Sequence, residues 1–437
     1  MRIRKWRDKM TIRAIDRMRM VSIFVTLFLG CPAFAQMLPS FGFTRVAAPP
    51  NFYGAVAVGD FNDDGNLDIA TGSCGSVQAG FGISLNTARS TDSIAFGGPI
   101  LNPYPYCVQS IYVADVNRDS RLDAIVSADV EGKVTILLGQ GNGTVKKGAE
   151  YSIQPTDATS YHWPKRLAVA DFDGDGNPDF AVGNGSRMDI WLGWGDGTFR
   201  IGSSQDLLTV LPWLLVAGDF NKDGIQDLAA FCRPSHTPWI SRVFVFDGHG
   251  DGTLAEPRRY EVAGDPSSAE LLAADMNGDG EDDLILWMSG QTEVYLNHGD
   301  GTFSPSVSSV CFGCSAAVFA VAADIDADGR TDLISPNGGA GLSHWMHIMV
   351  GAGDGRFWSV LHFPSATLPG RIALGDFNGD RRLDMFAIPS SSGSPGEKAT
   401  VWLGKSAPHL VVSVTQDRPV YNDEPTMPFT VRIGNAP

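Results

Sequence analysis

Charged residues are scarce in this chain, and basic residues are scarcer than acidic ones. Only 19% of the 437 residues are charged, and 33 Lys and Arg stand against 49 Asp and Glu, a net charge of −16. Residues 1–35 hold eight of the basic and two of the acidic residues, which leaves a net charge of −22 on the rest. Proteins gain affinity for nucleic acids by neutralising phosphates with Lys and Arg. The charge balance therefore argues against a nucleic-acid partner.

Long hydrophobic runs are also absent. The run Val21–Leu29 is far shorter than the roughly 20 residues that cross a bilayer, so we expect no membrane span. This run follows a basic stretch that ends at Arg19 and precedes Ala33–Ala35, a small-x-small cleavage pattern. Together these features predict a secretory signal peptide over residues 1–35. The protein is then secreted, exposed at the cell surface or periplasmic.

Two alternatives stay open for this leader. The basic stretch is long, so translation can also begin at Met18 or Met20. Leu29-Gly30-Cys31 resembles part of a lipobox, which would anchor the protein through a lipid on Cys31. Phe28 fits such a motif poorly, so we favour cleavage after Ala35.

Cysteine is rare as well, with six residues in the chain. Five of them follow the predicted signal peptide, and an oxidising compartment permits disulfides between them. Cys74 and Cys107 fall on the same side of the predicted repeats and can pair, and Cys311 and Cys314 can form a local disulfide; the pairing stays open, and Cys232 is the expected odd thiol. A zinc site needs four ligands, and no second Cys pair has the required spacing.

What the chain does have is a repeated acidic pattern, Asp-x-[Asp/Asn]-x-Asp-x-x-x-Asp. It occurs seven times at intervals of 48 to 56 residues, and a period of this size indicates a repeat architecture. We number the seven segments loop one to loop seven, and their residues position 1 to position 9. The loops begin at Asp60, Asp115, Asp171, Asp219, Asp275, Asp324 and Asp376.

The alternating oxygen groups of these loops predict calcium binding. Ca²⁺ takes several oxygen ligands in a flexible arrangement, and in loop three Asp171, Asp173 and Asp175 supply carboxylates at positions 1, 3 and 5. Gly176 at position 6 permits a sharp turn. The carbonyl of position 7 and the carboxylate of Asp179 complete the predicted site. The alternative is a metal-free turn held by hydrogen bonds from backbone amides to the acidic side chains.

The same five positions are the predicted metal ligands in every loop. They are Asp60, Asn62, Asp64, Asn66 and Asp68; Asp115, Asn117, Asp119, Arg121 and Asp123; Asp171, Asp173, Asp175, Asn177 and Asp179; Asp219, Asn221, Asp223, Ile225 and Asp227; Asp275, Asn277, Asp279, Glu281 and Asp283; Asp324, Asp326, Asp328, Arg330 and Asp332; and Asp376, Asn378, Asp380, Arg382 and Asp384. Up to seven Ca²⁺ ions are predicted. Loops two and seven carry Ser120 and Arg381 in place of Gly at position 6, so the other five loops are the stronger predictions.

A four-stranded unit surrounds each loop. A short apolar run such as Leu167–Ala170 precedes the loop, and a second run begins at its last Asp. A third run ends in an Asp-Gly turn such as Gly195–Phe199, which is a strong hairpin signal, and a fourth strand leaves that turn. Four strands in each of seven repeats predict an all-β fold, a seven-bladed β-propeller of four-stranded blades over residues 36–407. We expect the first strand of each blade to be innermost and buried on both faces.

The ends of the repeats predict a closed ring. The seventh repeat has no fourth strand after Val401–Gly404, and Phe41–Val46 is a spare strand before the first repeat. Pairing these two segments would remove an exposed sheet edge. Residues 408–437 follow the last blade and contain two apolar runs, Leu410–Val414 and Phe429–Ile433. They look like the opening of an immunoglobulin-like module or a β extension.

The apolar strand, the Asp-Phe-Asn-x-Asp-Gly-x-x-Asp loop and the Gly-Asp-Gly-Thr-Phe turn closely resemble the FG-GAP/VCBS repeat family. The best-known relatives in that family form the seven-bladed propeller of integrin α subunits. The resemblance covers about residues 41–405, and seven copies in register make it specific. It implies a secreted or surface propeller, with calcium in the loop between the first two strands of a blade.

Strand alternation places the acidic loops and the Asp-Gly turns on one face of such a propeller. The opposite face collects aromatic residues and histidines in Tyr104–Cys107, Tyr161–Trp163, His236–Trp239 and His344–His347. Exposed aromatics with polar neighbours often mark a binding surface. The alternative is that these side chains pack between blades.

These features predict a calcium-binding adhesion or recognition module that binds a protein or a glycan on the face opposite the acidic loops. The alternative is a carbohydrate-active enzyme on the same scaffold, of the polysaccharide lyase or sugar dehydratase type. His162, His236, His344 and His347 are its candidate bases, but they lie in different repeats. The sequence has no Ser nucleophile elbow, phosphate loop or dinucleotide fingerprint. We therefore favour the binding module and assign no catalytic residue.

Overall fold

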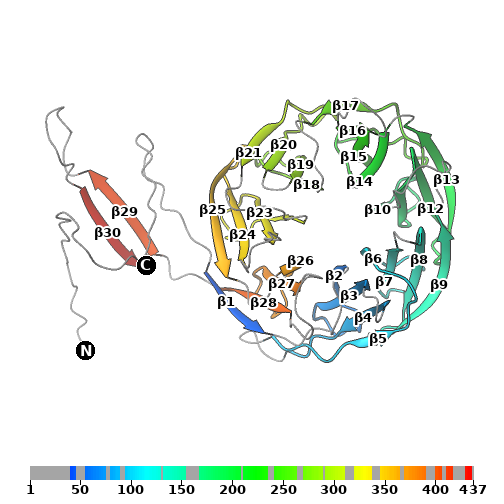
Figure 1. Cartoon of the computed structure of the whole chain (residues 1–437), viewed down its shortest axis with the longest axis horizontal. Helices are drawn as coiled ribbons and strands as arrows, with labels where there is room; N and C mark the ends of the chain where they lie inside the picture. Colours follow the sequence, from blue (N-terminus) through cyan, green and yellow to red (C-terminus); the bar gives the residue numbers. More distant parts are fainter. Residues whose placement is uncertain are drawn as a thin grey trace. The chain divides into compact units, whose positions relative to one another are not determined.

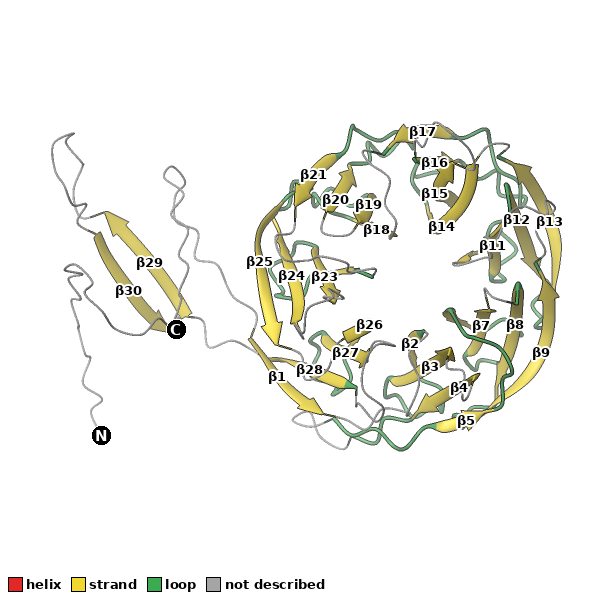
Figure 2. Ribbon diagram, viewed as in Figure 1, coloured by secondary structure: helices red, strands yellow, loops and turns green. Residues whose placement is uncertain are grey.

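Seven antiparallel four-stranded sheets form the blades of a closed ring in the computed structural model (Figure 1). Figure 2 shows strands joined by loops, with no helix in the part of the chain that is described. The predicted all-β, seven-bladed propeller is therefore confirmed. The structure describes residues 40–45, 55–74, 79–88, 94–128, 131–153, 167–207, 210–234, 241–262, 269–288, 291–310, 319–336, 345–364, 369–389, 399–405, 410–416 and 429–435.

Blades one to six each use four consecutive strands. In blades one and two these are β2 (Val56–Gly59), β3 (Asp68–Cys74), β4 (Ala79–Ser84) and β5 (Ile100–Asn102), then β6 (Ser110–Ala114), β7 (Asp123–Ala128), β8 (Lys133–Gly139) and β9 (Val145–Ser152). In blades three and four they are β10 (Leu167–Ala170), β11 (Asp179–Asn184), β12 (Arg187–Gly193) and β13 (Phe199–Asp206), then β14 (Val210–Gly218), β15 (Asp227–Pro234), β16 (Arg242–Phe246) and β17 (Arg258–Glu261). In blades five and six they are β18 (Ala269–Ala274), β19 (Asp283–Met288), β20 (Gln291–Tyr295) and β21 (Val307–Val310), then β22 (Val321–Ala323), β23 (Asp332–Pro336), β24 (Trp345–Gly351) and β25 (Phe357–Pro364).

The seventh blade joins the two ends of the ring. Its first three strands are β26 (Pro369–Gly375), β27 (Asp384–Pro389) and β28 (Thr400–Lys405), and its outer strand is β1 (Ser40–Arg45) from the start of the chain. The predicted closure by the N-terminal strand is thus confirmed. Pairing with β1 covers the edge of β28 that would otherwise be open to another chain.

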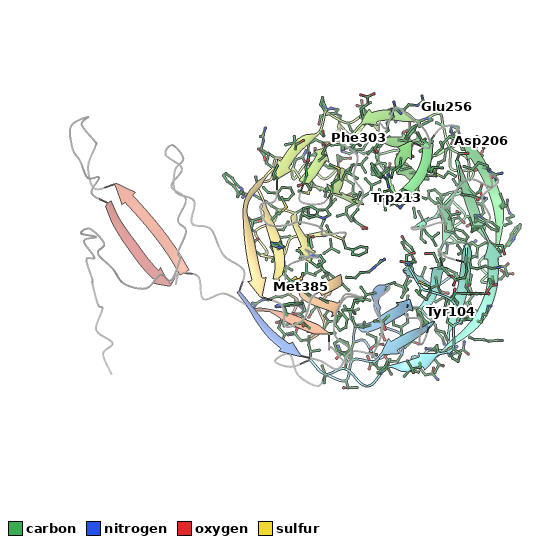
Figure 3. All side chains as sticks on the ribbon, in the orientation of Figure 1. Tyr104, Asp206, Trp213, Glu256, Phe303 and Met385 are labelled. Atoms are coloured by element: carbon green, nitrogen blue, oxygen red, sulfur yellow. The ribbon has the colours of Figure 1, made fainter. Side chains whose placement is uncertain are left out.

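The hydrophobic core lies between the blades rather than within them. Seven clusters of buried side chains each join two neighbouring blades, including the last and the first. Figure 3 labels Phe303, whose ring meets Phe220 of the preceding blade edge-on at a centroid distance of 5.8 Å. Because every blade packs on both neighbours, the stability of each blade depends on the blades beside it.

The second strand of a blade is more deeply buried than the first. All six residues of β7, β11 and β19 are buried, whereas β2, β6 and β10 are half-buried over much of their length. The prediction of burial on both faces is therefore wrong for the first strand and fits the second. The first strands line the inside of the ring, so part of each faces away from the blade-to-blade cores (Figure 1).

Residues Phe41–Gly404 form one compact unit, and a second unit contains the hairpin of β29 (Leu410–Gln416) and β30 (Phe429–Asn435). The two strands predicted after the propeller are confirmed, and their relation to an immunoglobulin-like module stays a prediction. The predicted signal peptide, the alternative start sites and Cys31 lie outside the described residues. The described part of the chain holds no helix of sufficient length and hydropathy to span a bilayer.

Candidate functional site

The seven acidic loops share one turn, which the Asp at position 1 organises. Its carboxylate accepts a hydrogen bond from the backbone N–H of position 6 in every loop, over 2.7 to 2.9 Å. The φ angle of position 6 is positive throughout, and this includes Ser120 at 65° and Arg381 at 68°. Loops two and seven therefore keep the same turn without Gly, although L-residues adopt this backbone at a cost.

Position 5 supports the next bend. Its carboxylate accepts a hydrogen bond from the backbone N–H of position 7 in all seven loops, over 2.8 to 3.0 Å. These bonds are those of an Asx-type turn. They hold the carboxylates at fixed places before any ion is added, which is the preorganisation that a metal site requires.

The Asp at position 9 begins the second strand and is fully buried in all seven blades. One of its oxygens accepts a hydrogen bond from the backbone N–H of position 2, over 2.8 to 3.1 Å. The other accepts from a backbone N–H at or just beyond the end of the third strand, over 2.7 to 2.8 Å. This carboxylate therefore ties three segments of the blade together, a structural role that the repeat pattern alone did not reveal.

Burial raises the pKa of every position-9 carboxyl, and the two backbone hydrogen bonds oppose that effect only in part. The pKa rises to about 6 in Asp68, Asp123, Asp227, Asp283 and Asp384. In loops three and six it rises to about 7, for Asp179 and Asp332. Those two loops also carry a third nearby carboxylate, at position 3.

Position 3 divides the loops into two kinds. In loop three an oxygen from each of Asp171, Asp173 and Asp179 lies within 4.8 Å of the others, and in loop six the same holds for Asp324, Asp326 and Asp332. Burial and neighbouring carboxylates raise the pKa of Asp173, and they raise the pKa of Asp326 to about 6. Converging oxygen ligands with uncompensated negative charge fit Ca²⁺, so these residues can hold the ion that the repeats predict.

The other five loops carry Asn at position 3. In four of them its side-chain N–H donates to the position-5 carboxylate, namely Asn62 to Asp64, Asn117 to Asp119, Asn277 to Asp279 and Asn378 to Asp380, over 2.8 to 3.3 Å. The neutral amide takes the place of one carboxylate, and its hydrogen bond partly compensates the charge of the carboxylate at position 5. These loops therefore present less uncompensated negative charge to a cation than loops three and six do.

The turn between the third and fourth strands lies on the same face as the acidic loops. In blade three the N–H of Gly197 donates to the carbonyl oxygen of Val116, position 2 of loop two, over 2.9 Å. The same bond joins blades one and two, three and four, four and five, and five and six. In the ring closure, the Asn86 side chain donates to the carbonyl of Phe377 in blade seven, over 2.7 Å. The predicted placement of these two sets of loops on one face is thus confirmed.

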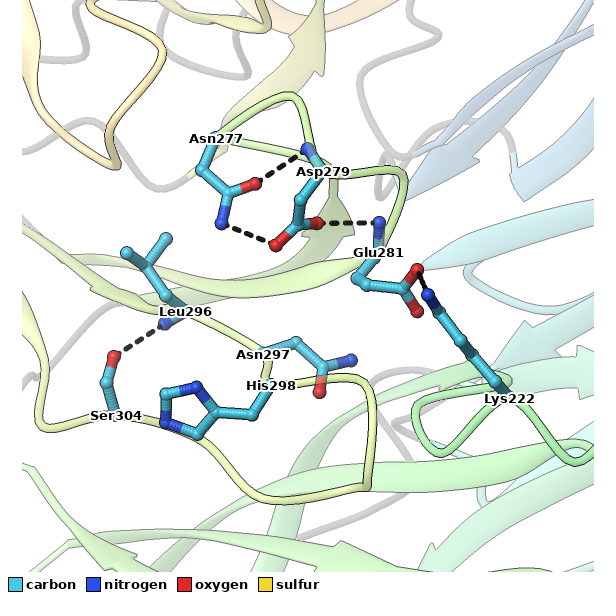
Figure 4. Close-up of a pocket in the computed structure, with 8 residues that line it drawn as sticks. All are labelled: Lys222, Asn277, Asp279, Glu281, Leu296, Asn297, His298 and Ser304. Atoms are coloured by element: carbon cyan, nitrogen blue, oxygen red, sulfur yellow. Dashed lines mark hydrogen bonds and ion pairs between the residues drawn. The ribbon is translucent and has the colours of Figure 1, made fainter.

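A cavity of about 390 Å³ opens on this face between blades four and five (Figure 4). Its lining is polar apart from Leu296, and it includes Lys222, Asn277, Asp279, Glu281 and His298. Asn277, Asp279 and Glu281 are positions 3, 5 and 7 of loop five, whereas Lys222 is position 4 of loop four. The repeat pattern did not single out position 4, because that position is not constant between loops.

The aromatic residues predicted on the opposite face are only partly described. Tyr104 is 4% exposed and its hydroxyl donates to Thr135 over 3.0 Å, while Tyr106 packs edge-on against it. His347 is 2% exposed. The alternative, that these side chains pack inside the propeller, therefore holds for Tyr104 and His347. Tyr161–Trp163, His236–Trp239 and His344 lie outside the described residues.

The structure tests two of the cysteine predictions. Cys107 is disulfide-bonded, and Cys232 is a buried free thiol, as expected. Burial raises the pKa of the Cys232 thiol, so it is an inert core residue. The side chain of Cys74 and the pair Cys311 and Cys314 lie outside the described part.

Solved structures with the same architecture are distant in sequence. BBS1N, solved in complex with ARL6DN, is 12% identical with a TM-score of 0.56, over 85% of this chain and 98% of that one. A protein from Lactobacillus plantarum is 11% identical with a TM-score of 0.52, over 73% and 86%. An Agrocybe aegerita lectin that recognises non-reducing terminal N-acetylglucosamine is 18% identical with a TM-score of 0.49, over 72% and 80%. The likenesses to BBS1N and to the Lactobacillus plantarum protein show the fold.

Among curated proteins none matches the chain. The model of one repeat family does match, and it is described as the FG-GAP-like repeat. It covers residues 115–182, 171–230, 275–335 and 324–387, which together make up more than half of the chain. The matched segments begin at position 1 of loops two, three, five and six, and they carry the loop and strands described above. The chain therefore belongs to the FG-GAP-like repeat family.

Proposed function

We propose that this protein is a secreted or surface-exposed calcium-binding propeller that recognises a protein or glycan partner and catalyses no reaction itself. The observation that carries the calcium part is the pair of three-carboxylate clusters in loops three and six. Each is built on a turn whose backbone already holds the carboxylates in place. The basic leader and small-x-small pattern of residues 1–35 support export.

The ion would be held by positions 1, 3, 5 and 9 of a loop, together with the carbonyl of position 7. Loops three and six would bind it most tightly, because position 3 adds a carboxylate there. Bound calcium supplies positive charge that removes the repulsion between these carboxylates. The residues themselves link the first strand, the second strand and the end of the third, so an occupied loop would stiffen its whole blade.

The partner-binding part of the proposal rests on the loops of the opposite face. Tyr104 and His347 are packed inside, so we assign recognition to Tyr161–Trp163 and His236–Trp239. Loops carried by a rigid scaffold are common sites of recognition. The similar propeller BBS1N binds a protein, ARL6DN, which fits the use of such a ring as a docking platform.

The calcium proposal is tested by titrating metal-stripped protein with Ca²⁺ in a calorimeter. Saturable binding of at least two ions, with Mg²⁺ binding more weakly, is the expected result, since Mg²⁺ resists flexible all-protein sites. No heat of binding in folded, verified metal-free protein would overturn it. Recognition is tested separately by a glycan array probed with the parent and with Trp163→Ala/Trp239→Ala. Glycan binding that the double variant retains in full would remove these residues from the site.

A further inference from the structure

Side chains at position 4 cross from one acidic loop to the next blade. This position has a positive φ angle, 61° at Lys222 and 59° at Arg118. Both side chains pass the first glycine of the next blade's turn. A β-carbon on Gly299 would come within 3.4 Å of Lys222 Cε, and one on Gly195 within 3.0 Å of Arg118 Nε. The side chain at position 4 takes the same path at both blade interfaces, so the conformation of the loop sets this path.

The side chain of Lys222 points toward Glu281, position 7 of loop five (Figure 4). Its ammonium forms an ion pair with the carboxylate of Glu281, which is only 7% exposed. Lys222 and Asp279, position 5 of loop five, line the same cavity. A lysine ammonium is charged at neutral pH, so Lys222 places a cation in the cavity that Asn277 and Asp279, two predicted ligands of loop five, also line.

We propose that Lys222 acts as a tethered cation that opposes divalent-ion binding in loop five, so that blade four sets the metal affinity of blade five. This inference rests on the proposed calcium function. A fixed positive charge near a site lowers its affinity for another cation, and the lysine also neutralises carboxylate charge that would attract the ion. A bound ion in turn weakens the attraction between Lys222 and loop five, and so loosens the contact between the two blades.

The neighbouring interfaces show what such a device requires. Loop five carries Gly278 at position 4, so it sends no side chain toward loop six. Loop two sends Arg118, but its guanidinium donates to the backbone carbonyl of Asp175 over 3.3 Å rather than to a carboxylate. Among the described residues, a cation at position 4 forms an ion pair with the loop of the next blade at the interface between blades four and five. The effect should therefore be specific to loop five.

The decisive variant is Lys222→Met, which removes the charge and keeps an apolar stem against Gly299. Lys222 is mostly exposed, so the fold should survive, and Lys222→Gln serves as a second charge-removing variant. Calorimetric Ca²⁺ titration of metal-stripped protein should show one site tightened about fivefold. The gain should shrink as salt is raised, because salt screens the charge.

Lys222 also belongs to loop four, so the matched control is the same substitution in an Asp279→Asn background, where loop five has lost a ligand. The inference expects the fivefold gain to disappear there. An equal gain in both backgrounds would mean that Lys222 acts on loop four and would overturn the inference. A parent that binds Ca²⁺ but does not respond to either charge-removing variant would overturn it as well. A parent protein that binds no Ca²⁺ would overturn the proposed function and, with it, this inference. That outcome is distinguishable from the two above, in which the parent does bind Ca²⁺.

Discussion

Loops three and six differ from the other five loops by one residue, and that residue changes the electrostatics of the whole turn. The hydrogen bonds of positions 1, 5 and 9 are the same in both groups. Asp at position 3 gathers three carboxylates within 4.8 Å, whereas Asn in the same place usually donates to the carboxylate at position 5. A repeat can therefore keep its backbone while the negative charge that a cation would meet differs from copy to copy.

The largest expected effect is that of removing calcium altogether. Each ion bound only to the native state at 100 times its dissociation constant stabilises the protein by about 2.7 kcal/mol. Two such ions, in loops three and six, correspond to a shift of roughly 10 °C in Tm. Differential scanning fluorimetry with excess chelator, and then with Ca²⁺ or Mg²⁺ restored, measures it. An unchanged Tm would mean that neither group of loops needs an ion.

The next largest effect is a change of stability with pH. We expect this change to have opposite signs in the metal-free and the calcium-loaded protein. The position-9 carboxyls have folded pKa values of about 6 to 7, above the ordinary value. The metal-free folded state therefore binds more protons than the unfolded chain, and its stability falls as pH rises from about 4 through about 7. We expect metal-free protein to be more stable at pH 5 than at pH 8 by roughly a few kcal/mol.

Calcium should reverse this trend, since protons compete with the ion for the same carboxylates. The loaded protein should then lose stability on acidification. Urea denaturation at pH 5, 6, 7 and 8, in metal-stripped buffers with and without Ca²⁺, separates the two curves. Parallel curves would indicate that the buried carboxyls do not sense the ion.

Exchanging position 3 between the two groups of loops tests the comparison directly. Asp173→Asn should lower the calcium affinity of loop three by about tenfold or more, through a lost ligand charge. It should also stabilise the metal-free protein by about 1 kcal/mol, because one like-charge contact is removed. Asn62→Asp in loop one is the matched reciprocal change and should have the opposite effect on both quantities. Calcium titration measures the affinity, and urea denaturation of metal-free protein measures the stability. If both variants change these two quantities in the same direction, position 3 does not separate the two groups of loops.

The sequence predicted the ring, its closure and the shared face of loops and turns, because each depends on a pattern that repeats at a fixed period. It did not predict contacts between residues that are far apart and outside the pattern. Arg118 meets Asp175 at a separation of 57 residues, and Lys222 meets Glu281 across two blades. Nothing in the local sequence signals that Tyr104 packs against Thr135 of the next blade. Nor does it signal that His347 is buried in β24, between two strands of its own blade.

The presence of Gly at position 6 is a weak indicator of which loops bind calcium. Gly at position 6 reports only on the ease of the turn, and Ser120 and Arg381 make the same turn with the same hydrogen bond to position 1. Position 3 reports on the charge that an ion would meet. The two criteria select different loops, since the first favours five of them and the second favours loops three and six.

The smallest expected effect separates these two criteria. Ser120 has a φ of 65°, a conformation that Gly adopts without the steric cost an L-residue meets. Ser120→Gly should therefore stabilise the protein by about 1 kcal/mol, an effect visible by urea denaturation. Its calcium titration should stay unchanged, because Asn117 still occupies position 3 of loop two. The matched control is Gly65→Ala in loop one, where a β-carbon would meet no atom within 4 Å, so only the backbone cost applies and stability should fall by a similar amount. If Ser120→Gly instead tightens calcium binding markedly, then the turn rather than the carboxylate count decides which loops bind, and the division of the loops by position 3 is wrong.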